Sequence, residues 1–228
     1  MSKLTFHGHA CCTLETSSGH RLMFDPWLDE NPLADIKTDA VGKLDYILCS
    51  HGHFDHFGDA IKLLRKTDAT LLATFELVAF AQKHGVAKGH GMSIGGGYRF
   101  PFGYAKMTPA MHGGQVAGDD EGIYTTQAAG WWLDLNGARF YHAGDTALLK
   151  DMELLNGRVD VALLPIGDNF TMGPDDAVRA VEMIAPRVVI PIHYNTFDVI
   201  KQDPYDFARK VGSKVEVRIL QPGDSYEF

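Results

Sequence analysis

The stretch "SHGHFDHFGD", residues 50–59, carries three histidines and one aspartate within six positions, namely His51, His53, Asp55 and His56. It directly follows "LDYILCS" (44–50), a continuous apolar run typical of a strand buried on both faces. Alternate side chains of an extended segment point the same way, and Gly52 and Gly58 allow the backbone to turn without a Cβ clash. Chance histidines in a polar turn are the alternative. However, H-x-H-x-D-H directly after an apolar strand favours a metal site.

The composition is that of an ordinary globular protein. The chain has 228 residues, 45% of them hydrophobic and 22% charged, so we expect a single domain over 1–228 with a sizeable core. The formal charge of -8 and the lack of any Lys or Arg run argue against nucleic acid as a partner. No stretch reaches the roughly 18 apolar residues of a membrane span, and the start lacks a signal-peptide pattern. Cys11, Cys12 and Cys49 then indicate reduced, buried thiols in a cytoplasmic protein without a membrane partner.

Strand patterns and helical patterns alternate along both halves of the chain. Strands are expected at 3–16, 20–27, 44–50, 69–74, 104–112, 159–167 and 187–194, helices at 59–67, 75–85, 146–157 and 173–186, and hairpins at 91–100 and 122–145. Asn136-Gly137, inside the second hairpin, is the strongest turn signal. Because each half begins with strands and continues with strand–helix alternation, we expect a layered α/β protein with two sheets.

Ligand-type residues recur where the expected strands end. They stand at His51, His112, Asp145 and His193, and each is followed by a loop or a helix. Imidazole and carboxylate donors together suit zinc, iron, manganese or nickel better than calcium or magnesium.

These motifs resemble those of the metallo-β-lactamase superfamily of metallohydrolases. "HGHFDH" looks like the H-x-H-x-D-H signature, and further motifs follow in order as "FDPW" with Asp25, "MHGG" with His112, "HAGDT" with Asp145 and "PIHYNTF" with His193. "HGHAC", "DPWLDENP" and "GDNFTMGPDDA" resemble a branch of metal-dependent hydrolases related to ascorbate-phosphate lactonases. The resemblance covers about residues 4–225 and implies a four-layer αββα sandwich with the metals at one edge between the sheets.

The resemblance also implies a ligand set for two divalent cations, foremost zinc, with manganese, iron and nickel as alternatives. The first cation is expected at His51, His53 and His112, and the second at Asp55, His56 and His193, with Asp145 as the bridge. Four positive charges, less two aspartates and one bridging hydroxide, leave about one positive charge, which favours a small anionic substrate or a developing oxyanion. The cations lower the pKa of bound water toward about 7, and Asp55 is expected to orient the resulting nucleophile.

Three further side chains are candidates for supporting the ligands or contacting the substrate. Asp25 is expected to hold a ligand histidine, with a purely structural role in its turn as the alternative. His9 alternates with His7 on an expected strand, so the two should share a face, with His9 either a substrate contact or a packed strand residue. Asn195 either donates a hydrogen bond to the substrate or caps its own loop. The glycine-rich segment 113–122 is expected to cover the pocket.

The function expected from this pattern is a binuclear metal-dependent hydrolase acting on a small ester, lactone, amide or phosphodiester. A nuclease of the same fold is an alternative, but it would need a basic surface that the composition lacks. A flavo-diiron redox protein would carry a carboxylate where His53 stands. A non-catalytic metal-binding protein also remains an alternative, and the oligomeric state is open, a homo-oligomer included.

Overall fold

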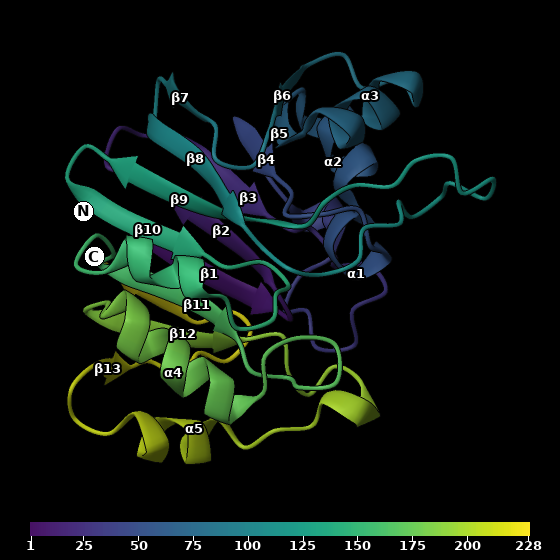
Figure 1. Cartoon of the computed structure of the whole chain (residues 1–228). Coiled ribbons are helices and arrows are strands. Elements are labelled where there is room, and N and C mark those ends of the chain that lie inside the picture. The colour runs from purple at the N-terminus through teal and green to yellow at the C-terminus, as the bar shows by residue number, and fades with distance from the viewer.

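Two mixed β-sheets of seven strands each pack face to face, and helices cover their outer faces (Figure 1). The structure, a computed structural model, describes residues 1–228. It confirms the expected four-layer αββα sandwich. No helix is long and apolar enough to cross a bilayer.

The first sheet consists of strands from the N-terminal half and the C-terminal strand β14, in the order β14-β1-β2-β3-β4-β5-β6. Its strands are β1 Lys3–Gly8, β2 Cys11–Glu15, β3 Arg21–Phe24, β4 Tyr46–Leu48, β5 Thr70–Thr74, β6 Gly89–Met92 and β14 Ser225–Glu227. From β3 to β6 the strands run parallel. Parallel neighbours need crossover connections. The helices of this half are α1 Phe54–Phe57, α2 Ala60–Thr67, α3 Phe75–Lys83 and the 3-10 turn η1 Thr38–Ala40.

The second sheet repeats this plan with the order β13-β12-β11-β10-β9-β8-β7. Its strands are β7 Gly97–Phe100, β8 Gly103–Pro109, β9 Ala129–Leu135, β10 Ala138–His142, β11 Val161–Pro165, β12 Val188–Ile192 and β13 Glu216–Val217. From β10 to β13 the strands are again parallel. The helices are α4 Pro174–Ile184, α5 Pro204–Val211 and the 3-10 turns η2 Lys150–Leu155 and η3 Asp198–Ile200.

The main core lies between the two sheets. It is a cluster of 25 buried residues drawn from both, and Phe24 of β3 meets Phe140 of β10 with ring centroids 5.3 Å apart. Two further clusters fill the space between each sheet and its own helices. Burial on both faces explains why β11 and β12, with all five residues of each buried, read as continuous apolar runs.

The turn at Asn136-Gly137 is confirmed, whereas the expected hairpin at 91–100 is wrong. Asn136 and Gly137 have φ values of 61° and 115°, as a tight hairpin between β9 and β10 requires. In contrast, β6 pairs with β5 in the first sheet and β7 pairs with β8 in the second. The glycine turn at 95–97 therefore carries the chain from the first sheet to the second. Met92 at the end of β6 and Phe100 at the end of β7 both bury their side chains in the core between the two sheets.

The expected strand at 3–16 is two antiparallel strands, β1 and β2, with a turn between them. Gly8 and His9 both have positive φ, at 101° and 58°, which ends the extended alternation at this point. His7 and His9 consequently do not share a face. The expected helix at 146–157 is the shorter 3-10 turn η2.

Candidate metal centre

The seven expected ligands come together at one edge of the sandwich. The loop after β4 and the short helix α1 carry four of them, and the other three follow the ends of β8, β10 and β12. The carboxyl ends of parallel strands meet at one edge of a sheet, which brings β10 and β12 to this site. Residues more than a hundred positions apart in the sequence thereby face one another.

Three imidazoles form the first group of donors, His51, His53 and His112. His51 Nε2 lies 2.9 Å from His53 Nδ1, and His112 Nε2 lies 3.2 Å from the same atom. A zinc ion with ligands at 2.0–2.1 Å in tetrahedral geometry spaces those ligand atoms about 3.3 Å apart. The spacing of these nitrogens therefore suits a single cation held among them.

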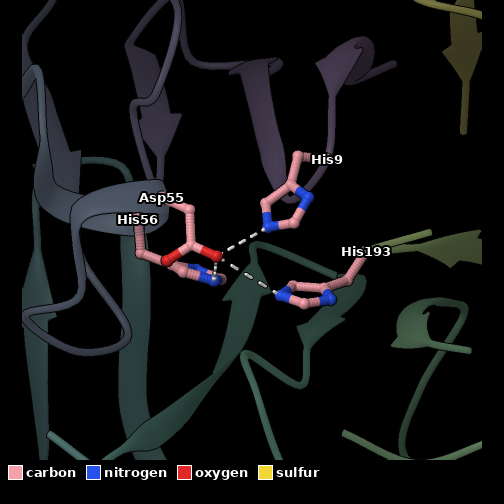
Figure 2. Close-up of side chains that lie close together, drawn as sticks. All are labelled: His9, Asp55, His56 and His193. Carbon is pink, nitrogen blue, oxygen red and sulfur yellow. Dashed lines mark hydrogen bonds and ion pairs between the residues drawn. The ribbon is translucent and has the colours of Figure 1, made fainter. Parts of the chain in front are cut away.

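Asp55, His56 and His193 form the second group, and His9 lies beside them (Figure 2). Asp145 groups with His51 and His56 and so stands between the two groups. Asp55 Oδ2 lies 3.7 Å from His193 Nε2 and 3.9 Å from His56 Nε2. Asp145 Oδ2 lies 2.9 Å from His193 Nε2 and 3.3 Å from His56 Nε2. It is also 3.5 Å from His112 Nε2 of the first group. One carboxylate oxygen within reach of both groups has the position that a bridging ligand needs.

Several donor atoms at this site are buried without a well-directed hydrogen bond, although two of them lie within 3.3 Å of Asp145 Oδ2. They are His56 Nε2, His193 Nε2 and Asp145 Oδ1. Buried polar atoms in proteins are nearly always satisfied, and each exception calls for an explanation. Divalent cations would satisfy the imidazole nitrogens and the carboxylate together, so the residues present fit a metal centre.

The charges of the donor residues also favour cations. Burial lowers the pKa of His51 well below its usual range. Burial opposes a charge on His56 and His193 as well, but Asp145 outweighs it, raising the pKa of His56 well above its usual range and that of His193 to about 9. Conversely, burial would raise the pKa of Asp145, but His193 and His56 hold it well below its usual range. The carboxylate is therefore ionised, and it attracts positive charge, whether protons or metals.

Asp25 holds two ligand-bearing positions from behind. Its Oδ2 accepts hydrogen bonds from His56 Nδ1 at 2.8 Å and Ser50 Oγ at 2.7 Å, and its Oδ1 accepts one from the Ser50 backbone at 2.7 Å. Because Ser50 Oγ donates to Asp25, it accepts from His51 Nδ1, which lies 2.9 Å away. Both histidines are thereby held in the tautomer whose Nε2 is free to bind a cation.

His9 contacts the site through Asp55 and does not line the pocket. Its Nε2 lies 3.1 Å from Asp55 Oδ2, its Nδ1 lies 2.5 Å from Thr196 Oγ1, and its ring packs 3.9 Å from that of His193. Burial and the neighbouring His193 lower the pKa of His9 to about 3, so the ring is neutral. It therefore donates from Nε2 to the carboxylate and accepts from the threonine hydroxyl. His7 instead faces Asp35 and Thr13.

Asn195 takes one of its two expected alternatives, the cap of its own loop, whereas residues 113–122 do not cover the pocket as expected. Asn195 is exposed and stands outside the metal pocket, and its Oδ1 accepts a hydrogen bond from the Gln202 backbone at 2.8 Å. The positive φ of 64° at Asn195 turns the chain so that its side chain caps its own loop. None of residues 113–122 lines the pocket, because Val116 packs into the core beside α2 and α3. The long connection between β8 and β9 extends outward past α1 (Figure 1).

Other residues at the site escaped the sequence reasoning. Thr146 is fully buried, its Oγ1 accepts from the Met111 backbone at 3.0 Å, and its carbonyl accepts from Met172 at 2.9 Å. It thus joins the loops that carry His112 and Asp145. The "HAGDT" motif contained this threonine directly after the aspartate, and that position was the available signal.

The pocket over the donors has a volume of about 460 Å³. Its lining consists of ligand-type residues and apolar ones, namely His53, Phe54, Asp55, His112, Asp145, Phe170, His193, Phe197 and Val199. The four apolar residues come from three separate segments, namely α1, the loop after β11 and the segment around η3, and no periodic pattern in the sequence marks them.

Comparison with known sequences and structures agrees with this geometry. Residues 20–194 match the model of the Beta-lactamase superfamily domain. A "UPF0173 metal-dependent hydrolase" of Heliobacterium modesticaldum is 46% identical over 99% of this chain and 97% of its own length. A protein of the same name from Enterococcus faecalis is 44% identical, covering 98% of each chain.

Solved structures extend the likeness. Igni18, described as a novel metallo hydrolase from the archaeon Ignicoccus hospitalis, superposes with a TM-score of 0.89 at 33% identity, covering all of both chains. An isothiocyanate hydrolase from Delia radicum gut bacteria has a TM-score of 0.80 at 19% identity, over 99% of this chain and 98% of the other. At that identity the second likeness concerns the fold alone.

Proposed function

Because this chain belongs to the metallo-β-lactamase superfamily and is a metal-dependent hydrolase, we propose that it works with two divalent cations on a small ester, lactone, amide or phosphodiester. Zinc is the first choice, with manganese, iron and nickel as alternatives. We also propose that this chain belongs to the branch of metal-dependent hydrolases related to ascorbate-phosphate lactonases.

One observation carries the proposal. Seven donors from both halves of the chain lie in overlapping groups, whose donor atoms are within 4.8 Å of one another, and Asp145 Oδ2 is near histidines of both groups. One cation would need only one of these groups. A second cation explains why the buried nitrogens of His56 and His193 lack hydrogen bonds although the first group alone could hold a metal.

The chain's own residues would position the reaction. Bound divalent cations supply Lewis acidity and lower the pKa of water to about 7, which provides a hydroxide nucleophile at neutral pH. Asp55 lines the pocket, and its Oδ2 accepts from His9, which leaves Oδ1 to orient the attacking water and take up its proton. The lining contains no Lys, Ser or Tyr that could protonate the leaving group. We therefore assign that proton transfer to Asp55 as well.

The same proposal covers partner and location. We propose a small-molecule substrate that presents an anion or a developing oxyanion to the cations, and neither nucleic acid nor a membrane as partner. The net charge of -8 would repel a polyanion before it reached the site. A cytoplasmic location agrees with the three cysteines, which are free and buried.

Metal analysis followed by a substrate screen tests the proposal. Protein purified without added metal is assayed for bound zinc, manganese, iron and nickel, and is then loaded with each metal in turn. We expect two equivalents per chain and metal-dependent hydrolysis of at least one small ester, lactone or phosphodiester. A stoichiometry of one, or of none after loading, contradicts the binuclear proposal. Cleavage of structured RNA that weakens as salt rises would favour the nuclease alternative.

A further inference from the structure

We propose that the apolar rim of the pocket, formed by Phe54, Phe170, Phe197 and Val199, binds an aromatic or similarly bulky apolar group of the substrate. The substrate's only anionic group is then the one that faces the cations. This inference rests on the proposed function, since it names the kind of ester or lactone that the same site takes.

One wall of the pocket is a preformed aromatic stack. Trp27 is buried, and its ring stacks on Phe197 with centroids 5.5 Å apart and meets Phe54 edge-on at 5.7 Å. Phe54 and Phe197 lie 6.2 Å apart. Since Trp27 packs against both phenylalanines, their rings have a fixed support and need not rearrange to receive a ligand. Rigid aromatic surface beside a polar reaction centre is typical of small-molecule sites.

The pocket lining also includes Phe170, which stands on a strained turn. Asp168 and Asn169 both have positive φ, at 62° and 50°, a conformation that costs free energy even for these tolerant residue types. Hydrogen bonds from Asp168 N to Met172 O at 3.0 Å and from Asn169 N to Asp168 Oδ1 at 2.9 Å close the turn. Phe170 is left 51% exposed at the mouth of the pocket. A binding role for the ring would explain both the strain and the exposure.

The charges of the lining restrict the substrate further. No Lys or Arg lines the pocket, so the bound cations are its only source of positive charge. A second anionic group on the substrate would lie against Phe170, Val199 or Phe197 without a partner, and burial of an unpaired charge is costly. Val199 is 59% exposed and gains apolar contact only when a ligand covers it.

Three hydroxamic acids probe this rim without depending on turnover. They are acetohydroxamate, phenylacetohydroxamate and succinic monohydroxamate, each titrated calorimetrically into zinc-loaded protein. We expect phenylacetohydroxamate to bind at least about tenfold more tightly than acetohydroxamate, because its phenyl group buries apolar area on the rim. The succinic compound, which carries a second carboxylate, should bind no more tightly than acetohydroxamate.

Variants then locate the effect. Phe170→Ala and Val199→Ala should each lower the ratio of the phenylacetyl to the acetyl affinity by about threefold or more, and Phe170→Leu should restore part of it. Phe75→Ala is the matched control, since Phe75 is a 66% exposed phenylalanine on α3 outside the pocket, and it should keep the full ratio. Equal affinities for all three compounds, or a ratio that Phe170→Ala and Val199→Ala leave unchanged, overturn the inference. If the protein holds two zinc ions but binds no hydroxamate, the inference is overturned as well. If the protein binds no zinc, the proposed function on which the inference rests is overturned.

Discussion

In the first half of the chain, most of the metal-facing side chains are hydrogen-bonded to a side chain that is not itself a ligand, whereas His193 and Asp145 in the second half have no such partner. His51 contacts Ser50, His56 contacts Asp25 and Asp55 contacts His9. In the second half, His193 Nδ1 and Asp145 Oδ1 are buried without any partner. These ligands are positioned by backbone hydrogen bonds, for example the one of 2.8 Å from His193 N to His9 O.

This difference separates ligands oriented by the protein from ligands oriented by the metals. A side chain that is already hydrogen-bonded loses little freedom when a cation binds, so its half of the site is preorganised. His193 Nδ1 and Asp145 Oδ1 have no hydrogen bond that fixes their orientation, so we expect the cations to fix it. The metals should therefore stabilise the second half more than the first, and each prediction below tests that contrast.

Removal of the metals should have the largest effect. Two tightly bound cations, each about a hundredfold above its Kd, contribute about 2.7 kcal/mol apiece, so chelation should lower the melting temperature by about 10 °C or more and abolish hydrolysis. Hydrogen exchange measured with and without chelator should show a larger increase in peptides over 144–147 and 192–197 than over 50–57. An equal or larger increase over 50–57 would remove the contrast between the halves.

Substitution of Asp145 should come next in size. Since its Oδ2 lies near His56, His112 and His193, Asp145→Ala should reduce bound metal at both sites and lower activity by at least about a hundredfold. His112→Ala and His193→Ala should each weaken one site only. Inductively coupled plasma analysis of metal per chain distinguishes these cases. Two tightly bound metals and full activity in Asp145→Ala would show that it is not the bridge.

Loss of the support behind the first-half ligands should be smaller. Asp25→Asn keeps the volume but lacks the charge that fixes the His56 tautomer, and it should weaken metal binding by about 10- to 100-fold in a chelator competition. Asp59→Asn is the matched control, because this buried carboxylate accepts from the backbone of Leu28 and Asp29 and contacts no ligand. It should change the melting temperature but not the metal affinity. Similar losses of affinity in both variants would mean that Asp25 acts only through general stability.

The positions of the site residues in the sequence explain which of them could be predicted and which could not. Four ligands were recognisable because they lie in one loop, and the three others because each follows a strand end. The expected shared face of His7 and His9 was wrong because Gly8 and His9 have positive φ, where a period-two pattern no longer tells which way a side chain points. The sequence left two roles open for Asn195, and the folded turn decides between them because the side chain caps its own loop. The contribution of Phe170 and Phe197 to the pocket could not be predicted, since isolated apolar residues in loops carry no periodic signal and come together only in the folded chain.

The smallest predicted effect concerns Thr196, the residue behind His9. Thr196→Val keeps the shape but removes the hydroxyl that donates to His9 Nδ1, so the tautomer that donates to Asp55 is less well fixed. A hydrogen bond of this kind contributes about 1 kcal/mol, which corresponds to an approximately fivefold weaker second metal site. Thr13→Val is the matched control, because Thr13 Oγ1 lies 2.7 Å from His7 Nε2 in an equally buried pair that has no contact with the metal centre. Both variants should lose similar stability in urea denaturation, but only Thr196→Val should lose metal in a chelator competition, and Thr196→Ser should regain it. If Thr13→Val loses metal to the same extent, the effect is one of stability, and His9 does not position Asp55.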